Sequence, residues 1–263
     1  MTIALLMRRL LPALLYACLC GGAWAQPQPM SDEELSHTSG QGLIAMSNSS
    51  LNGFDFTRIS LDADITLSAN FGNMRLGEYN YAPRNGTGAD IDMPALQFGR
   101  SDGTDANRLV HISNPYFEFV YQNAADGASR QVIGMRLGFD AISGDVGLKI
   151  NSLSGSMLVN GTDASGNPIA LDSHTDTSGG GKRWDGSCTA PCLPMAQLGG
   201  VTAGDASGPS RDFWISVLKT GVQFSASGSG VVPDQAQAGV WLNWRDKLTA
   251  LSATLPPNLP KGH

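Results

Sequence analysis

Apolar residues occupy every second position in three groups within the segment from Arg130 to Gly161. The groups are Ile133, Met135, Leu137 and Phe139; Val146, Leu148 and Ile150; and Met157 and Val159. A period of two is typical of a β-strand with one buried face. Two turn signals, Ser143-Gly144-Asp145 and Ser154-Gly155-Ser156, lie between the groups. The segment therefore predicts short strands joined by tight turns.

Similar patterns predict that most of the chain is β-strand. We expect strands at Ile59–Leu67, Ala95–Phe98, Leu109–Ile112 and Tyr116–Tyr121, hairpins and loops over the rest of 79–107, and a strand or short helix over Phe213–Ser225. Asn114-Pro115 should separate two of these strands, because proline cannot donate to a central ladder. Glycine accounts for 32 of 263 residues and charged residues for only 15%, which favours turns over long helices. The prediction is one all-β domain over residues 49–255, a mainly antiparallel sandwich or β-roll.

The first 25 residues have the order of a secretory signal peptide. They contain the basic pair Arg8-Arg9, the apolar run Leu10–Leu19 and the small-x-small site Ala23-Trp24-Ala25, with either Met1 or Met7 as the initiator. The apolar run is shorter than the ~18 residues that a spanning helix needs, so we expect no transmembrane helix. The predicted destination is the periplasm, the outer-membrane surface or the outside of the cell.

The charge of the chain argues against nucleic acid as a partner. The formal net charge is −6, and removal of residues 1–25, which hold two arginines and no acid, would leave 15 basic and 23 acidic residues, or −8. Phosphate binding needs a basic footprint, which this composition lacks.

Residues 26–48 predict a spacer followed by one short helix. Ser31 can cap the helix, and Glu34 stands at the third helical position, where it completes a capping box. Gly40 supplies the left-handed stop. A helix of two turns is marginal alone, so we expect it to form only when docked on another surface.

This segment resembles exported, pilus-associated proteins of Gram-negative bacteria that are described as the Fil type. The similar residues, which follow a signal peptide and precede a glycine-rich β domain, are Ser31, Asp32, Glu33, Glu34, Leu35, Ser36, Ser39, Gly40 and Gln41. The resemblance implies an envelope or surface component that is associated with a filament.

Two interpretations of the short helix remain open. In the first, Ser31, Glu34, Leu35, Gly40 and Gln41 form a docking element for another envelope or surface protein. In the second, the helix closes one end of the β domain.

Residues 172–212 show no periodicity, which is unusual for about forty residues inside a compact domain. The stretch holds the basic-aromatic cluster Lys182, Arg183 and Trp184, the predicted contact loop. A solvated loop without a partner is the alternative.

Cys188 and Cys192 lie in the same stretch, and in an exported chain their spacing predicts a local disulfide. A metal site that includes His174 is the sharper alternative, but one Cys-x-x-x-Cys pair is weak evidence for it. We expect no metal and no cofactor.

The C-terminal part predicts a closing helix. Val240, Trp244, Leu248, Leu251 and Leu255 recur at helical spacing. A strand over Ala238–Trp244 with a helix only afterwards is the alternative. Pro256-Pro257 should end the helix and leave residues 256–263 as a tail.

No catalytic motif occurs in its proper context, so we expect a protein that is not an enzyme. Gly99–Gly103 has the form G-x-S-x-G, but it leads into a predicted strand and no βαβ framework surrounds it. Asp62 and Asp64 share the polar face of a strand, where solvated carboxylates are the ordinary case.

Three function hypotheses follow. The leading one is a non-enzymatic envelope or surface protein with a structural or adhesive role in a filament. The second is a carbohydrate-binding module, whose candidate stacking residues are Trp184, Trp241, Trp244, Tyr79, Tyr81 and Tyr116. The third is an outer-membrane barrel. The alternation of apolar and polar residues favours it, whereas the lack of an aromatic residue at the end of the sequence argues against it.

Overall fold

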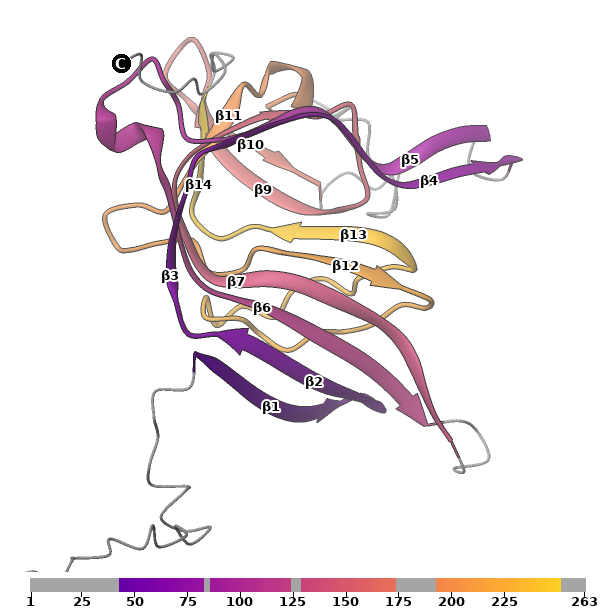
Figure 1. Cartoon of the computed structure of the whole chain (residues 1–263). Coiled ribbons are helices and arrows are strands. Elements are labelled where there is room, and N and C mark those ends of the chain that lie inside the picture. The colour runs from indigo at the N-terminus through magenta and orange to yellow at the C-terminus, as the bar shows by residue number, and fades with distance from the viewer. Residues whose placement is uncertain (1–42, 83–85, 124–128, 174–192, 252–263) are drawn as a thin grey trace, which may run out of the picture. The chain divides into compact units, whose positions relative to one another are not determined.

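The computed structural model describes residues 43–82, 86–123, 129–173 and 193–251, and nearly all of its regular structure is β-strand (Figure 1). The strands are β1 (Ile44–Leu51), β2 (Phe54–Leu61), β3 (Asp64–Leu67), β4 (Ala69–Tyr81), β5 (Gly86–Phe98), β6 (Val110–Asn123), β7 (Arg130–Lys149), β8 (Ser152–Leu153), β9 (Gly155–Thr162), β10 (Pro168–Asp172), β11 (Gly200–Ala203), β12 (Trp214–Leu218), β13 (Gly239–Trp244) and β14 (Leu248–Leu251). Two short 3-10 helices are η2 (Asp105–Arg108) and η3 (Met195–Gln197). The all-β, mainly antiparallel prediction is confirmed, since among these strands only the pairs β13–β9 and β14–β9 are parallel.

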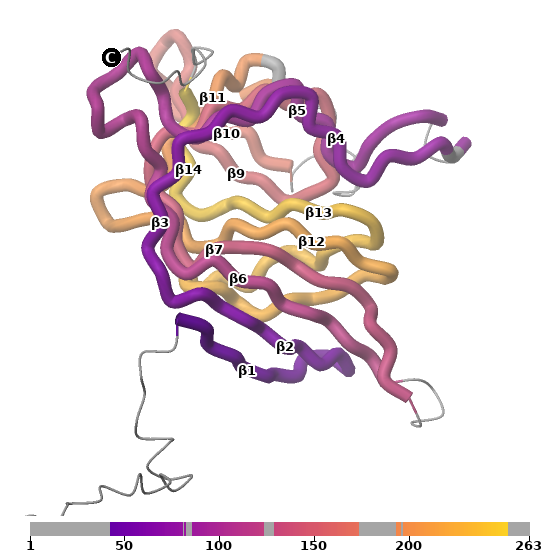
Figure 2. Tube along the Cα trace, viewed as in Figure 1, coloured from indigo at the N-terminus to yellow at the C-terminus, as the bar shows by residue number. Residues whose placement is uncertain are grey.

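Strand β7 is the centre of the sheet (Figure 2). Its first part pairs with β6 and β12, and its last part pairs with β5 and β11. From β12 the ladder continues through β13, β9, β14 and β11, and so returns to β7 as a closed circuit. Two arms extend from β7: the first arm is β6, β2 and β1, and the second arm is β5 and β4.

The predicted turn at Ser143-Gly144-Asp145 is wrong, because β7 runs through it without a break for 20 residues. Gly144 has a φ of +123°, and a Cβ there would lie 3.0 Å from the carbonyl oxygen of Leu109. Glycine therefore lets the strand bend from one layer into the other while its ladder continues.

The predicted break at Asn114-Pro115 is also a bend, because β6 is one strand of 14 residues. Its first residues pair with β3 and its later residues pair with β2. The change of partner falls at Asn114, whose φ is +48°. Proline is tolerated there because the ladder is already interrupted at the change of partner.

The predicted closing helix over Val240–Leu255 is wrong. Residues Gly239–Trp244 form β13, which confirms the strand of the alternative over Ala238–Trp244. Leu248–Leu251 form β14, so the described residues after Trp244, up to Leu251, do not show the helix that the alternative placed there. The two strands lie in different layers, and Lys247, with a φ of +53°, is part of the crossing between them. Both faces of β13 are buried, so apolar residues occupy adjacent positions along it. Their spacing therefore does not distinguish a strand from a helix.

Three further segments contain more strand than the sequence predicts. The hairpin of β4 and β5 occupies much of residues 79–107. Strand β11 and the buried Leu193 and Met195 lie within the aperiodic stretch 172–212. Strand β1 begins at Ile44, inside the segment assigned to the spacer and helix.

Two apolar cores stabilise the unit Gly42–His263. The main core lies inside the circuit and includes Ile142, Val146, Met157, Val159, Val201, Leu242, Trp244 and Leu248. The second core covers the opposite face of β6, β7, β12 and β13, and it includes Phe56, Val120, Ile133, Trp214, Leu218, Val222, Phe224 and Trp241. Ile133 joins this second core because β7 bulges there: Val120 pairs with Gly134 and Tyr121 with Val132, which leaves Ile133 unpaired in the ladder.

Candidate functional site

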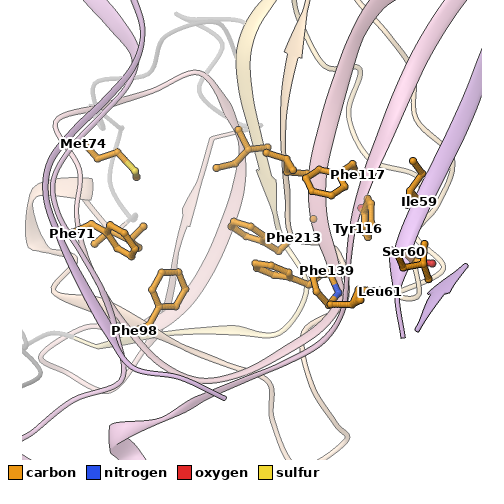
Figure 3. Close-up of a pocket in the computed structure, with 16 residues that line it drawn as sticks. Ile59, Ser60, Leu61, Phe71, Met74, Phe98, Tyr116, Phe117, Phe139 and Phe213 are labelled. Carbon is orange, nitrogen blue, oxygen red and sulfur yellow. The ribbon is translucent and has the colours of Figure 1, made fainter. Parts of the chain in front are cut away.

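An apolar groove lies between the two arms (Figure 3). Its first wall is one face of β2, β6, β7 and β12. Residues paired across antiparallel strands point to the same face, so Ile59, Phe117, Leu137 and Ile215 form one row across this wall. The wall is completed by Ile44, Leu61, Pro115, Phe139 and Phe213.

The second wall is the hairpin of the second arm. It contributes Phe71 and Met74 from β4, and Leu96 and Phe98 from β5. Phe71 and Phe98 meet edge to face with ring centroids 6.1 Å apart. The cavity between the walls is about 560 Å³, which lies in the ~300–1,000 Å³ range of small-molecule sites.

None of the 16 residues that line the groove is charged. The remaining lining residues, Ser60, Tyr116 and Gly138, alternate with wall residues along their strands, so their side-chain positions belong to the opposite face. There the guanidinium of Arg58 lies 3.7 Å from the centroid of the Tyr116 ring. Burial raises the pKa of the Tyr116 phenol, which stays protonated at neutral pH. The groove can bury an apolar group, and the described residues of its walls supply no acid, base or nucleophile.

A smaller space of about 30 Å³ lies behind the groove, within the main core. Leu96, Phe98, Phe213 and Ile215 line both spaces and so separate them. Trp244 belongs to the inner wall and meets Phe213 edge to face, with centroids 5.1 Å apart. The groove therefore opens to solvent on one side and borders the main core on the other.

The mouth of the groove exposes large apolar side chains. Phe117 is 50% exposed, Phe71 48% and Leu137 44%. Single exposed apolar residues are ordinary, but a cluster of them around a concave apolar site is typical of a binding surface.

Strand β1 forms the outer edge of the first arm and pairs, among the described strands, with β2 alone. Its eight residues, IAMSNSSL, include no charge and no proline, which are the usual protections of a sheet edge. Ile44 and Met46 are 65% and 67% exposed on the same face as the groove. The edge is therefore open to the addition of another strand.

One buried ion pair lies on the face of β6 and β7 opposite to the groove. Glu118 accepts a hydrogen bond from Nε of Arg136 at 2.5 Å, and both side chains are less than a tenth exposed. The ring centroid of Phe224 lies 4.2 Å from the guanidinium carbon of Arg136 and covers the pair. Neither residue lines the groove, so we assign them a structural role.

The residues that the sequence selects for partner contact lie outside the described residues. They are Ser31, Glu34, Leu35, Gly40 and Gln41 of the docking segment, Lys182, Arg183 and Trp184 of the contact loop, and Cys188, Cys192 and His174. Their roles stay predictions. The described carboxylates Asp62 and Asp64 are exposed, and Asp64 accepts a hydrogen bond from Ser113 at 2.5 Å.

Of the candidate glycan-stacking residues, Trp184 and the side chain of Tyr81 lie outside the described part of the structure, and the other four do not form an exposed surface. Trp241, Trp244 and Tyr116 are at most 5% exposed, and they belong to the packed interior. Tyr79 is half-buried in β4. Sugar stacking needs exposed aromatic faces, so these side chains carry no support for the carbohydrate hypothesis.

Residues 43–82, 86–123, 129–173 and 193–251 contain no group of three or more His, Cys, Asp or Glu residues that could hold a metal ion. No helix in them has the length and apolar character to cross a membrane. The G-x-S-x-G sequence lies between β5 and η2, where Arg100 binds Asp102 through two hydrogen bonds.

Comparison with known proteins does not assign the groove. No family model, curated protein or solved structure matches this chain. The function must therefore be argued from the groove and the strands that form it.

The sequence predicts part of the groove walls but not the groove. Ile59, Leu61, Leu137 and Phe139 are apolar positions of expected strands, whereas Ile44 falls in the segment predicted as spacer and helix and Phe71 in none of the predicted strands. No local pattern shows that the two arms stand apart and leave a groove between them.

Proposed function

We propose that this chain is an exported, non-enzymatic binding protein of the cell envelope, and that the apolar groove is its binding site. The observation that carries the proposal is the concave space of about 560 Å³, whose described lining residues include no charged side chain. The signal-peptide pattern of residues 1–25 supports export. The half-exposed Phe117 and Leu137 support binding, because covering them removes apolar area from water.

Titration with an apolar fluorescent dye such as anilinonaphthalene sulfonate tests the groove. The folded protein should bind the dye at one saturable site. Leu137→Glu should weaken binding at least tenfold, because it places a charge in the middle of the apolar row. The matched control is Val217→Glu, since Val217 is 53% exposed on the same face but does not line the groove. Equal dye binding by both variants would overturn the proposal.

We propose as a second function that the protein associates with a filament or another surface protein through β1. The partner would add an extended, uncharged strand with apolar residues at alternate positions, which would continue the face of Ile44 and Met46. The uncharged open edge favours this, and so does the resemblance to pilus-associated proteins.

Fractionation after mechanical shearing tests this association. A tagged wild-type protein should appear with the sheared surface material. Ala45→Lys/Ser47→Lys should leave the protein in the soluble fraction, because charges on an edge strand oppose strand addition. Ser165→Lys, in the exposed turn between β9 and β10, is the matched control and should behave as wild type. A soluble wild type would contradict filament association and leave the groove proposal standing.

A further inference from the structure

We infer that the groove binds the acyl chain of a single-chain lipid and leaves its polar headgroup in solvent. This inference rests on the proposed binding function of the groove and names its ligand class. It depends on three features: the polarity of the walls, the position of the inner space and the absence of a charged group at the site.

The polarity of the walls distinguishes an acyl chain from a peptide. Both walls are faces of paired strands, whose backbone groups already take part in ladders. A peptide in the groove would therefore bury its own amide groups without hydrogen-bond partners, which is costly for each group. An acyl chain has no polar group to satisfy, and it gains from every methylene removed from water.

The inner space favours a long and unbranched ligand. It continues the groove behind Phe98, Phe213 and Ile215, and its own lining is apolar. The end of a chain that enters through the mouth would lie against Phe98 and Phe213, which separate the groove from Met157 and Trp244 in the main core.

Among the described residues, no charged side chain lines the groove to bind the headgroup. Affinity should therefore follow the length of the chain and be nearly independent of the charge of the headgroup. Each added methylene should tighten binding by about threefold to fourfold until the groove is filled.

Competition against the bound dye tests the inference with the full exported chain. Palmitate and palmitoyl lysophosphatidylethanolamine should displace the dye with similar affinity. Octanoate, which is eight methylenes shorter, should do so more weakly by about 6,000-fold or more, as eight increments of at least threefold require. Leu137→Glu should weaken palmitate binding about tenfold or more, and Val217→Glu should leave it unchanged. Near-ultraviolet circular dichroism would establish that both variants are folded.

The outcomes separate the inference from the proposed function. If the dye binds and Leu137→Glu weakens it, but palmitate does not displace it, the groove is a binding site and the acyl-chain inference is wrong. Displacement by an uncharged peptide and not by palmitate would overturn the inference in the same way. If neither the dye nor palmitate binds the folded protein, both proposals fail.

Discussion

At the scale of single residues, Glu118 and Arg136 form a buried ion pair whose guanidinium lies against the ring of Phe224. The two residues are opposite each other in β6 and β7, and both side chains are almost fully buried. A charge that is buried without its partner is strongly unfavourable. The pair therefore tightly links the stability of β6 to that of β7.

We predict that Glu118→Gln lowers the free energy of unfolding by about 3 kcal/mol or more, because it leaves the Arg136 charge uncompensated. Urea denaturation followed by tryptophan fluorescence would measure it. Asp55→Asn, which removes the exposed partner of Arg130, should have little effect. Glu118→Leu/Arg136→Met should recover most of the loss, and failure to recover would contradict the ion-pair explanation.

A second prediction concerns Asp212. Burial raises the pKa of its carboxyl more than the hydrogen bonds from the backbone N–H groups of Asp246 and Arg245 lower it. A raised folded-state pKa means that the folded chain holds this proton more tightly than the unfolded chain. The stability contributed by Asp212 is therefore lost as pH rises from about 4 through the raised value.

Denaturation of wild type and Asp212→Asn across this pH range would measure that contribution. The free energy of unfolding of wild type, minus that of the variant, should fall as pH rises. Asp163→Asn is the control with the opposite sign, because the side-chain hydrogen bond from Asn167 lowers the pKa of Asp163. If the free energy of unfolding of wild type minus that of Asp212→Asn stays constant or rises with pH, this explanation is wrong.

At the scale of elements, glycines set how closely the strands approach. A Cβ at Gly134 of β7 would overlap the carbonyl oxygen of Val217 in β12. We predict that Gly134→Ala destabilises the protein by about 2 kcal/mol or more. Gly72→Ala in β4, where nothing lies within 4 Å, should change stability by no more than about 0.5 kcal/mol. Thermal unfolding of the two variants would compare them, and equal midpoints would contradict the close approach.

Strands β7, β9 and β13 show which features of a strand can be predicted from the sequence and which cannot. A period of two identified the β character of β7 and β9, because alternation is a local property of a strand. It could not separate a turn from a bend at Gly144, because glycine permits both and the partners that continue the ladder are distant in sequence. The predicted closing helix failed because β13 is covered on both faces, which removes the alternation that would have marked it as a strand.

At the scale of the whole molecule, the groove is a consequence of one long strand that belongs to two layers. β7 carries the first arm near its beginning and the second arm near its end, and the circuit closes the space behind them (Figure 1). Two arms on opposite ends of a bent strand face each other without meeting. Several wall residues could be predicted from the sequence, but the space could not, because it depends on pairings between residues 76 to 87 positions apart.

We propose that the space between the two arms holds an apolar chain. Photolabelling with a palmitate analogue that carries a diazirine at its chain terminus, followed by mass spectrometry, tests this most directly. We predict that label concentrates on the groove and its inner space, at residues such as Met74, Phe98 and Phe213, and that excess palmitate removes it. Label spread over the surface, or unchanged by excess palmitate, would contradict the account.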